Sequence, residues 1–154
     1  MRITTWAEYG LIVSLHLAKH GNGRPRPARD VAEQEGLPPD YVEQILLKLR
    51  RAGLVRSVRG ARGGYLLARA PEAVTVKDVI EAAEHRTFEV NCDVYPVSAE
   101  RCHSEGGCAI RPMWRALQRR IDEFLEGVTL AGLLADEMQV ESLLAETAGV
   151  GSDV

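Results

Sequence analysis

The apolar and polar positions at the start of the chain follow the period of an amphipathic helix. Thr4 or Thr5 is placed to cap a helix that runs to about Lys19, with apolar residues recurring every three or four positions. The glycines of the segment 21–23, followed by two prolines, end this pattern. We therefore expect a first helix of about four turns that packs one face against a core.

Two further helices are predicted immediately after it, one short and one longer. The short helix covers 29–34 and stops at Gly36, and the longer helix opens at Pro39 and closes near Gly53. In the longer helix a single buried stripe is expected, formed by Val42, Ile45, Leu46 and Leu49. A short helix, a tight turn and a longer helix together indicate a helix-turn-helix.

A β-hairpin is predicted directly after the helix-turn-helix. In LVRSVRGARGGYLLAR two β-prone runs flank a glycine-rich segment, which is the pattern of a hairpin with its turn. A hairpin in this place is a wing, and its basic tip could lay Arg59 and Arg62 against DNA phosphates or in the minor groove. Winged-helix folds also serve as protein-interaction modules, but the arginines at this tip favour DNA.

The remaining elements are predicted to be helices. The segment 75–84 is a capped amphipathic helix, and a longer helix ends at Gly127 with a seam like that of a coiled coil. Its apolar residues are Ile110, Met113, Trp114, Leu117, Ile121, Phe124 and Leu125. Because such a seam has to be covered, we expect it to form a two-fold dimer, and a further short helix to follow at 129–137.

These elements predict a mainly α fold with a small β-hairpin wing, that is, a winged helix-turn-helix plus a long dimerisation helix. The expected organisation has three parts. Residues 1–70 form the DNA-binding region, 71–138 hold the cysteine loop and the dimerisation helices, and 139–154 form a partly disordered tail.

Charge supports the same division of the chain. The net charge is −3, but residues 1–70 carry +6 and residues 71–154 carry −9. The segment KLRRAGLVRSVRGAR, residues 48–62, has six cations and no acid. A solvated helix face would also explain a run of charge, yet its place in a helix-turn-helix and wing favours a polyanion as the partner.

The residues expected to contact DNA lie on the longer helix of the helix-turn-helix and on the wing. Those on the outward side of the helix and at the hairpin tip are Tyr41, Glu43, Gln44, Lys48, Arg51, Arg59, Gly60 and Arg62. A two-fold dimer would place two such helices about one DNA turn apart, so a palindromic double-stranded operator is expected.

Other classes of protein are disfavoured. No apolar run of about 18 residues could cross a bilayer, and the start of the chain does not have the pattern of an export signal. We therefore expect a cytoplasmic protein. No nucleophile, base or phosphate-binding constellation accompanies the cysteines, so an enzyme is not expected.

All three cysteines of the chain lie within CDVYPVSAERCHSEGGC, at positions 92, 102 and 108. An odd number of cysteines in a reducing compartment argues against a disulfide framework. The spacing is more open than that of common zinc sites, whereas a flexible loop of thiolates suits an iron–sulfur cluster. On these residues alone a metal or cluster site, a thiol redox switch and simple burial all stay open.

Three segments of the chain resemble the winged-helix iron–sulfur transcriptional regulators of the NsrR and IscR type. They are MRITTWAEYGLIVSLHLA, DYVEQILLKLRRAGLVRSVRGARGGYLLAR and VNC…CHSEGGC…ALQRRIDEFLEGVTLAGLLADE, and the similarity covers about residues 1–138. The resemblance implies a homodimer in which the cysteine loop of one subunit lies close to the first helix of the other.

The resemblance also implies a ligand set. Cys92, Cys102 and Cys108 would hold the cluster, and Glu8 of the partner subunit matches the acidic ligand of NsrR-like members. IscR-like members have a histidine three positions after the last cysteine, where this chain has Arg111. The chain is therefore closer to the NsrR type.

Two of these positions have simpler interpretations. Glu8 lies near the start of a helix, where a carboxylate stabilises the helix dipole without any ligand role. His103, a weaker alternative for the fourth ligand, could be a solvated loop residue.

The function expected from the residues and the resemblance together is that of a dimeric transcriptional regulator, most simply a repressor. A 2Fe–2S or 4Fe–4S cluster would control its operator binding in response to nitric oxide, redox state or iron–sulfur status. The alternative is a winged-helix regulator that acts as a metal-free thiol redox switch or contains zinc.

Overall fold

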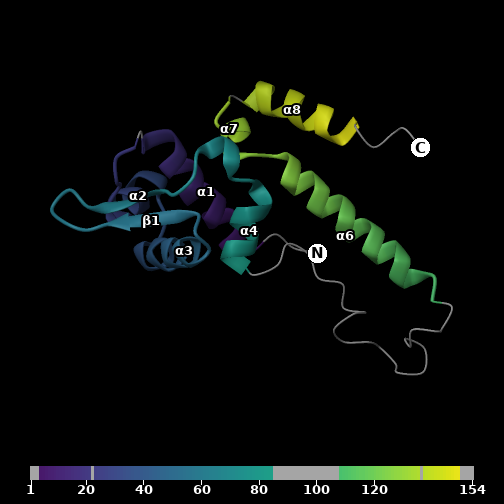
Figure 1. Cartoon of the computed structure of the whole chain (residues 1–154), viewed down its shortest axis with the longest axis horizontal. Coiled ribbons are helices and arrows are strands. Elements are labelled where there is room, and N and C mark those ends of the chain that lie inside the picture. The colour runs from purple at the N-terminus through teal and green to yellow at the C-terminus, as the bar shows by residue number, and fades with distance from the viewer. Residues whose placement is uncertain (1–3, 22, 85–107, 136, 150–154) are drawn as a thin grey trace.

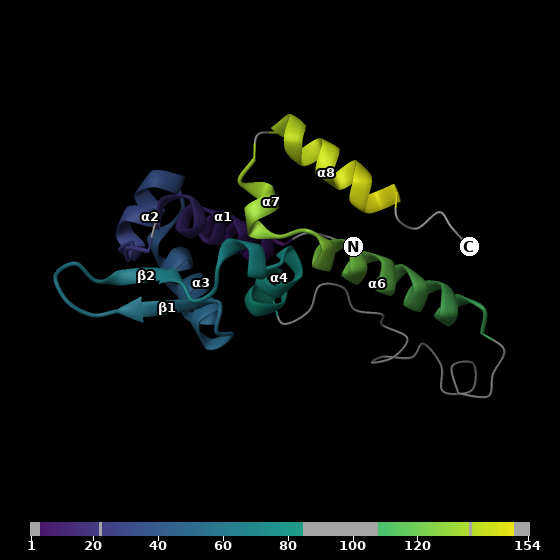
Figure 2. The ribbon, with the colours of Figure 1, turned by 45° about the horizontal axis from the view of Figure 1, so that its top comes forward.

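A computed structural model of the chain describes residues 4–21, 23–84, 108–135 and 137–149. Within these ranges the chain forms seven α-helices, one short 3-10 helix and one two-stranded hairpin. Figures 1 and 2 show a winged-helix body at one end, from which α6 extends, with α8 running beside α6. The predicted fold class is confirmed, whereas Cys92, Cys102 and His103 lie outside the described residues.

The body is built on three helices, α1 (Thr5–His20), α2 (Ala28–Glu35) and α3 (Pro39–Arg51). Thr4 caps α1, and Gly36 ends α2 in the left-handed conformation with φ 65°, which glycine adopts without strain. The four apolar residues of the stripe predicted for α3 are all fully buried, in the core between α1, α2 and the hairpin. The predicted helix-turn-helix is confirmed.

The hairpin consists of β1 (Val55–Val58) and β2 (Gly64–Leu67), paired antiparallel in the register Val55 to Leu67. A further bridge joins Arg26 to Tyr65 through two backbone hydrogen bonds of 2.8 Å. Gly64 has φ 147° and lies so close to the backbone of Arg26 that a Cβ there would come within 2.4 Å of it. The segment before α2 therefore fixes the base of the wing.

After the 3-10 helix Pro71–Ala73, α4 (Val76–Glu84) packs against α1. Thr75 and Asp78 cap it reciprocally, because each accepts a hydrogen bond from the backbone N–H of the other, at 3.0 and 3.1 Å. Val79 and Ala83 are fully buried. A Cβ on Gly10 would lie 3.2 Å from the Cβ of Ala83, so α1 and α4 approach each other closely at this glycine.

We expect Gly10→Val to destabilise the body by about 1–3 kcal/mol, because its methyl groups have no room between α1 and α4. Urea unfolding followed by circular dichroism measures this free energy. Gly132→Ala is the matched control, since a Cβ there meets its nearest neighbour at an ordinary 3.5 Å. Equal stability of Gly10→Val and the wild type would contradict the close packing of the two helices.

The long helix α6 (Ile110–Gly127) has no fully buried residue. Five large apolar side chains, which we call the α6 stripe, are 37–52% exposed: Ile110, Met113, Trp114, Leu117 and Phe124. The helix is joined to the body at its end, where Lys77 donates to Glu126 at 2.5 Å. This hydrogen bond raises the pKa of Lys77. The chain then returns to the body through the backbone bridge between Thr75 and Thr129.

Two helices complete the described chain. The predicted helix after α6 is present as α7 (Leu130–Leu133), capped by the hydroxyl of Thr129. We expected a partly disordered tail over 139–154, but the structure has a further helix, α8 (Glu137–Gly149), over most of it. Leu143 of α8 packs onto Gly132, which explains how this helix is held. No helix among the described residues is long and apolar enough to cross a membrane.

Candidate DNA interface and cysteine site

The exposed side of α3 carries four of the eight residues predicted to contact DNA. Tyr41, Glu43, Gln44 and Arg51 are exposed, while the opposite side of the helix is held in the core. Because the helix is fixed in this way, its outer side chains can bind a partner with a smaller loss of conformational entropy. Amide and guanidinium groups on such a side can form paired hydrogen bonds with base edges.

Lys48 is placed differently from the expectation. Its ammonium group donates to the backbone carbonyl of Ala83 at 2.7 Å and lies 4.0 Å from the ring centre of Trp6. Tyr41 also packs against Trp6 at a tilt of 38°, with 5.1 Å between ring centres. Lys48 is therefore half-buried between α1, α3 and α4, and a contact with DNA would require it to leave this carbonyl.

The tip of the wing is exposed and basic. Arg59, Gly60 and Arg62 all face solvent. Gly60 has φ 114°, and the N–H of Gly63 donates to its carbonyl at 2.9 Å, which closes the turn. The turn therefore holds two arginines at the end of a short, well-paired hairpin, in the position expected of a groove-contacting wing.

Two more arginines, which are not among the residues predicted to contact DNA, lie beside the wing. Arg24, Arg26 and Arg62 line a hollow of about 530 Å³, together with Pro25, Pro27, Asp30 and Gly63. The bridge between Arg26 and Tyr65 brings the segment RPRP next to the hairpin. The alternation of arginine and proline after α1 was the available signal, but only the pairing with β2 shows that it extends the basic surface of the wing.

Of the predicted cysteine ligands, the structure describes Cys108, which is half-buried two residues before α6. Glu8 is exposed on α1. The N-terminal end of α1 already has an anion, because the carboxylate of Glu84 accepts from the hydroxyl of Thr4 and from the backbone N–H of Ala7, at 2.9 Å from the latter. Glu8 is thus accessible to another subunit, and stabilising the helix dipole is not its only available role.

The comparisons with known proteins agree on one family. Residues 3–136 match the Rrf2 family, described as an iron-dependent transcriptional regulator. The protein named HTH-type transcriptional regulator IscR from Erwinia tasmaniensis is 36% identical over 137 residues, which cover 89% of this chain and 81% of that protein. The protein of the same name from Aliivibrio salmonicida is 36% identical over 136 residues, or 88% of this chain and 79% of the relative.

Solved structures give the same result. The structure of T. potens IscR is 34% identical, with a TM-score of 0.69 over 90% of this chain and 91% of that one. The structure of CymR, the global cysteine regulator of B. subtilis, is 32% identical, with a TM-score of 0.71 over 88% of this chain and 99% of that one. With its helix-turn-helix and basic wing, the chain is a DNA-binding transcriptional regulator and not an enzyme, and it belongs to the Rrf2 family.

Proposed function

We propose that this protein is a homodimeric repressor whose binding to a palindromic operator is controlled by an iron–sulfur cluster. The observation that carries the proposal is the grouping of all three cysteines just before α6, in a member of a family described as iron-dependent. The signal is nitric oxide, redox state or iron–sulfur status. Each part of the proposal rests on a different region of the chain.

DNA binding is assigned to α3 and the wing. Gln44 and Arg51 on the exposed side of α3, with Tyr41 and Glu43, enter the major groove, and the wing lies along the adjacent backbone or minor groove. Arg24 and Arg26 add phosphate contacts beside Arg62. The +6 charge of residues 1–70 supplies the sequence-independent part of the affinity.

We expect Arg59→Ala to weaken operator binding and to make it less dependent on salt, because one phosphate contact is lost. Fluorescence anisotropy over a range of salt concentrations measures both quantities, and the slope of log affinity against log salt should fall in magnitude by about one. Arg120→Ala removes the same charge from the exposed side of α6 and is the control. A salt slope equal to that of the wild type would reject a phosphate contact at Arg59.

Dimerisation is assigned to the α6 stripe. These side chains are exposed in the single chain, and the seam that they form resembles that of a coiled coil. Pairing two copies of α6 covers the stripe and sets the distance between two winged-helix bodies, as a palindromic site requires.

The cluster site is assigned to Cys92, Cys102 and Cys108 together with Glu8 of the partner subunit, with His103 as the weaker alternative to Glu8. The donor set fits, since thiolates suit iron–sulfur centres and the exposed Glu8 can reach another subunit. A bound 2Fe–2S or 4Fe–4S cluster supplies a centre that reacts with nitric oxide and oxidants.

The protein's own part in the switch lies in how its ligands are connected. Cys108 lies next to α6, and Glu8 lies on α1, which packs against both helices of the helix-turn-helix. Cys108 and the partner subunit's Glu8, if both held the cluster, would restrain α6 of one subunit relative to α1 of the other. A hundredfold change in operator affinity needs only about 2.7 kcal/mol of coupling between these positions.

We expect Glu8→Gln to weaken retention of the cluster while leaving the fold intact, because an amide replaces a carboxylate ligand on an exposed position. Iron and sulfide content after gel filtration without oxygen measures retention. If Glu8 only stabilises the helix dipole, the change would instead cost a few tenths of a kcal/mol in folding and leave iron and sulfide unchanged. Glu33→Gln, on the exposed side of α2, controls for the loss of one carboxylate.

A second candidate function is a thiol redox switch without metal. The likeness to CymR, whose structures include one of the Staphylococcus aureus protein in an oxidised form, favours it. Such a switch would depend on oxidation of the cysteines and would give a colourless protein. The zinc-containing alternative would likewise give a colourless protein. It would purify with bound zinc, and replacing the cysteines would abolish zinc binding.

Binding of DNA before and after nitric oxide tests the proposed function. A duplex selected from a random pool by the chain with its cluster is titrated under anaerobic conditions, and the titration is repeated after nitric oxide has been added. The proposal predicts a fall in affinity of about a hundredfold. Equal affinities under both conditions would reject control by nitric oxide, and a response to thiol oxidation alone would favour the second candidate.

A further inference from the structure

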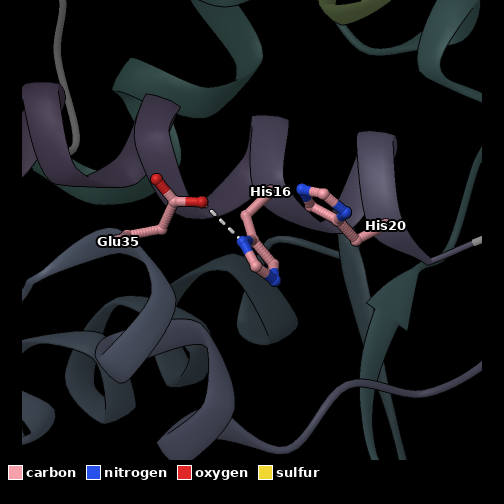
Figure 3. A group of neighbouring side chains, drawn as sticks. All are labelled: His16, His20 and Glu35. Carbon is pink, nitrogen blue, oxygen red and sulfur yellow. Dashed lines mark hydrogen bonds and ion pairs between the residues drawn. The ribbon is translucent and has the colours of Figure 1, made fainter.

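Two histidines and a carboxylate meet where α1, α2 and α7 come together. Figure 3 shows the imidazole of His16 between Glu35 and His20. The Nδ1 atom of His16 lies 2.6 Å from a carboxylate oxygen of Glu35, and the rings of His16 and His20 are 4.7 Å apart between centres. One ligand atom from each of the three residues lies within 4.8 Å of the others.

The surroundings of His16 are unusual for a residue with only a structural role. Its side chain is fully buried, and its second ring nitrogen, Nε2, has no hydrogen-bond partner among the described residues. Buried polar groups generally have a hydrogen-bond partner, so a buried nitrogen without one needs an explanation. A hollow of about 300 Å³ lies beside the three residues, walled by Ile12 and Leu15 of α1 and by residues 133–135.

Two helix ends contribute partial negative charge at this cluster. His20 is the last residue of α1 and Glu35 is the last residue of α2, so both lie at the end of a helix where partial negative charge collects. The last turn of α2 has no basic residue, and the acidic Glu35 there opposes the helix dipole. Lys19 and Arg26 lie near His20 and oppose a cation, so nitrogen ligation has to contribute to the binding.

We propose that His16, His20 and Glu35 form a site for a divalent transition-metal ion of the zinc class. Two imidazole nitrogens and one carboxylate oxygen are a ligand set that zinc accepts, with water in the remaining position. The unpartnered Nε2 of His16 is the nitrogen available to bind the ion, and the ligand atoms move to accept metal bonds of about 2.0–2.2 Å. Magnesium and calcium are disfavoured because they require mostly oxygen ligands.

The place of the site gives it a consequence for DNA binding. Glu35 lies at the end of α2, one residue before the tight turn that leads to α3, and His16 and His20 lie on α1. An ion held by all three fixes the helix-turn-helix to the first helix. Loss of the ion frees the end of α2. Whether the metal site is occupied therefore biases the position of α3, independently of the cysteines.

Zinc binding to the full-length chain tests the proposal. Cys92, Cys102 and Cys108 are replaced together by serine, so that zinc cannot bind to thiolates, and Zn²⁺ affinity is measured by competition with a chromophoric chelator. We expect one zinc ion per chain, together with a rise in melting temperature on adding zinc. In this background His20→Ala and Glu35→Gln are each compared with Glu33→Gln, which changes an exposed carboxylate on the same helix without touching the site.

The variants decide the outcome because His20 and Glu35 have exposed side chains, so replacing them leaves the core intact. We expect each of the two to lower zinc affinity by more than about tenfold and to remove the rise in melting temperature, while Glu33→Gln keeps both. Absence of zinc binding in the serine background, or zinc binding retained in both His20→Ala and Glu35→Gln, would overturn the proposal. Neither result depends on the cluster.

Discussion

Serine in place of Cys108 is expected to give a purified chain with only background levels of iron and sulfide. Cys108 is one of three thiolate ligands assigned to the cluster, and a hydroxyl is a poor substitute for a thiolate at an iron–sulfur centre. The fold should be unaffected, because Cys108 lies ahead of α6 and outside the core of the body. Iron and sulfide analysis after anaerobic purification measures the effect, and circular dichroism checks the fold.

Ala109→Ser is the matched control for this variant. It introduces the same hydroxyl one position further along, on an exposed residue. The proposal expects wild-type iron and sulfide in the control and loss of both with Cys108→Ser. Equal iron and sulfide in the two variants would remove Cys108 from the ligand set.

The second large effect is expected from an acidic residue within the α6 stripe. Leu117→Asp places a charge in the seam between two copies of α6, where it would be desolvated without a partner, so the dimer should dissociate. A monomer contacts one half-site only, and its affinity for a palindromic duplex should fall by about a hundredfold or more. Sedimentation equilibrium measures the mass, and fluorescence anisotropy measures the affinity.

Arg119→Asp controls for the added acid, because Arg119 is also exposed on α6 but is not part of the stripe. The control should stay dimeric. A dimer that persists in Leu117→Asp at the same concentrations would show that another surface pairs the subunits.

The winged helix-turn-helix could be predicted from sequence because its signals are local. The Gly36 stop, the proline at the start of α3 and the glycine-rich turn of the wing each fix a boundary through backbone conformation, with no need for distant contacts. The stripe of α3 was likewise predictable, since helical period alone shows which residues share a face.

The features that were missed depend on contacts between segments far apart in the sequence. The bridge between Arg26 and Tyr65 joins a proline-rich segment to a strand, and no local pattern indicates it. The α8 helix has weak amphipathic character and is held by packing onto α7, so the local pattern of its segment does not predict it. The pair of His16 and Glu35 is separated by 19 positions and forms only when α1 and α2 pack together.

The DNA interface shows the same limit. Helical period predicts that Lys48 points outward with its neighbours on α3, yet its long side chain reaches the backbone carbonyl of Ala83 and the face of Trp6. A charged group at the edge of a core takes such partners when they are within reach. Sequence could place Lys48 on α3, but it could not show that α1 and α4 pack beside it.

The central claim, that the cysteines hold an iron–sulfur cluster, is tested most directly by visible absorption of the anaerobically purified chain together with its iron and sulfide content. The proposal predicts a brown protein with stoichiometric iron and sulfide whose absorption bleaches or shifts when nitric oxide is added. A colourless protein without iron or sulfide, even after reconstitution with both, would contradict it and leave DNA binding to be governed by zinc or by the thiols.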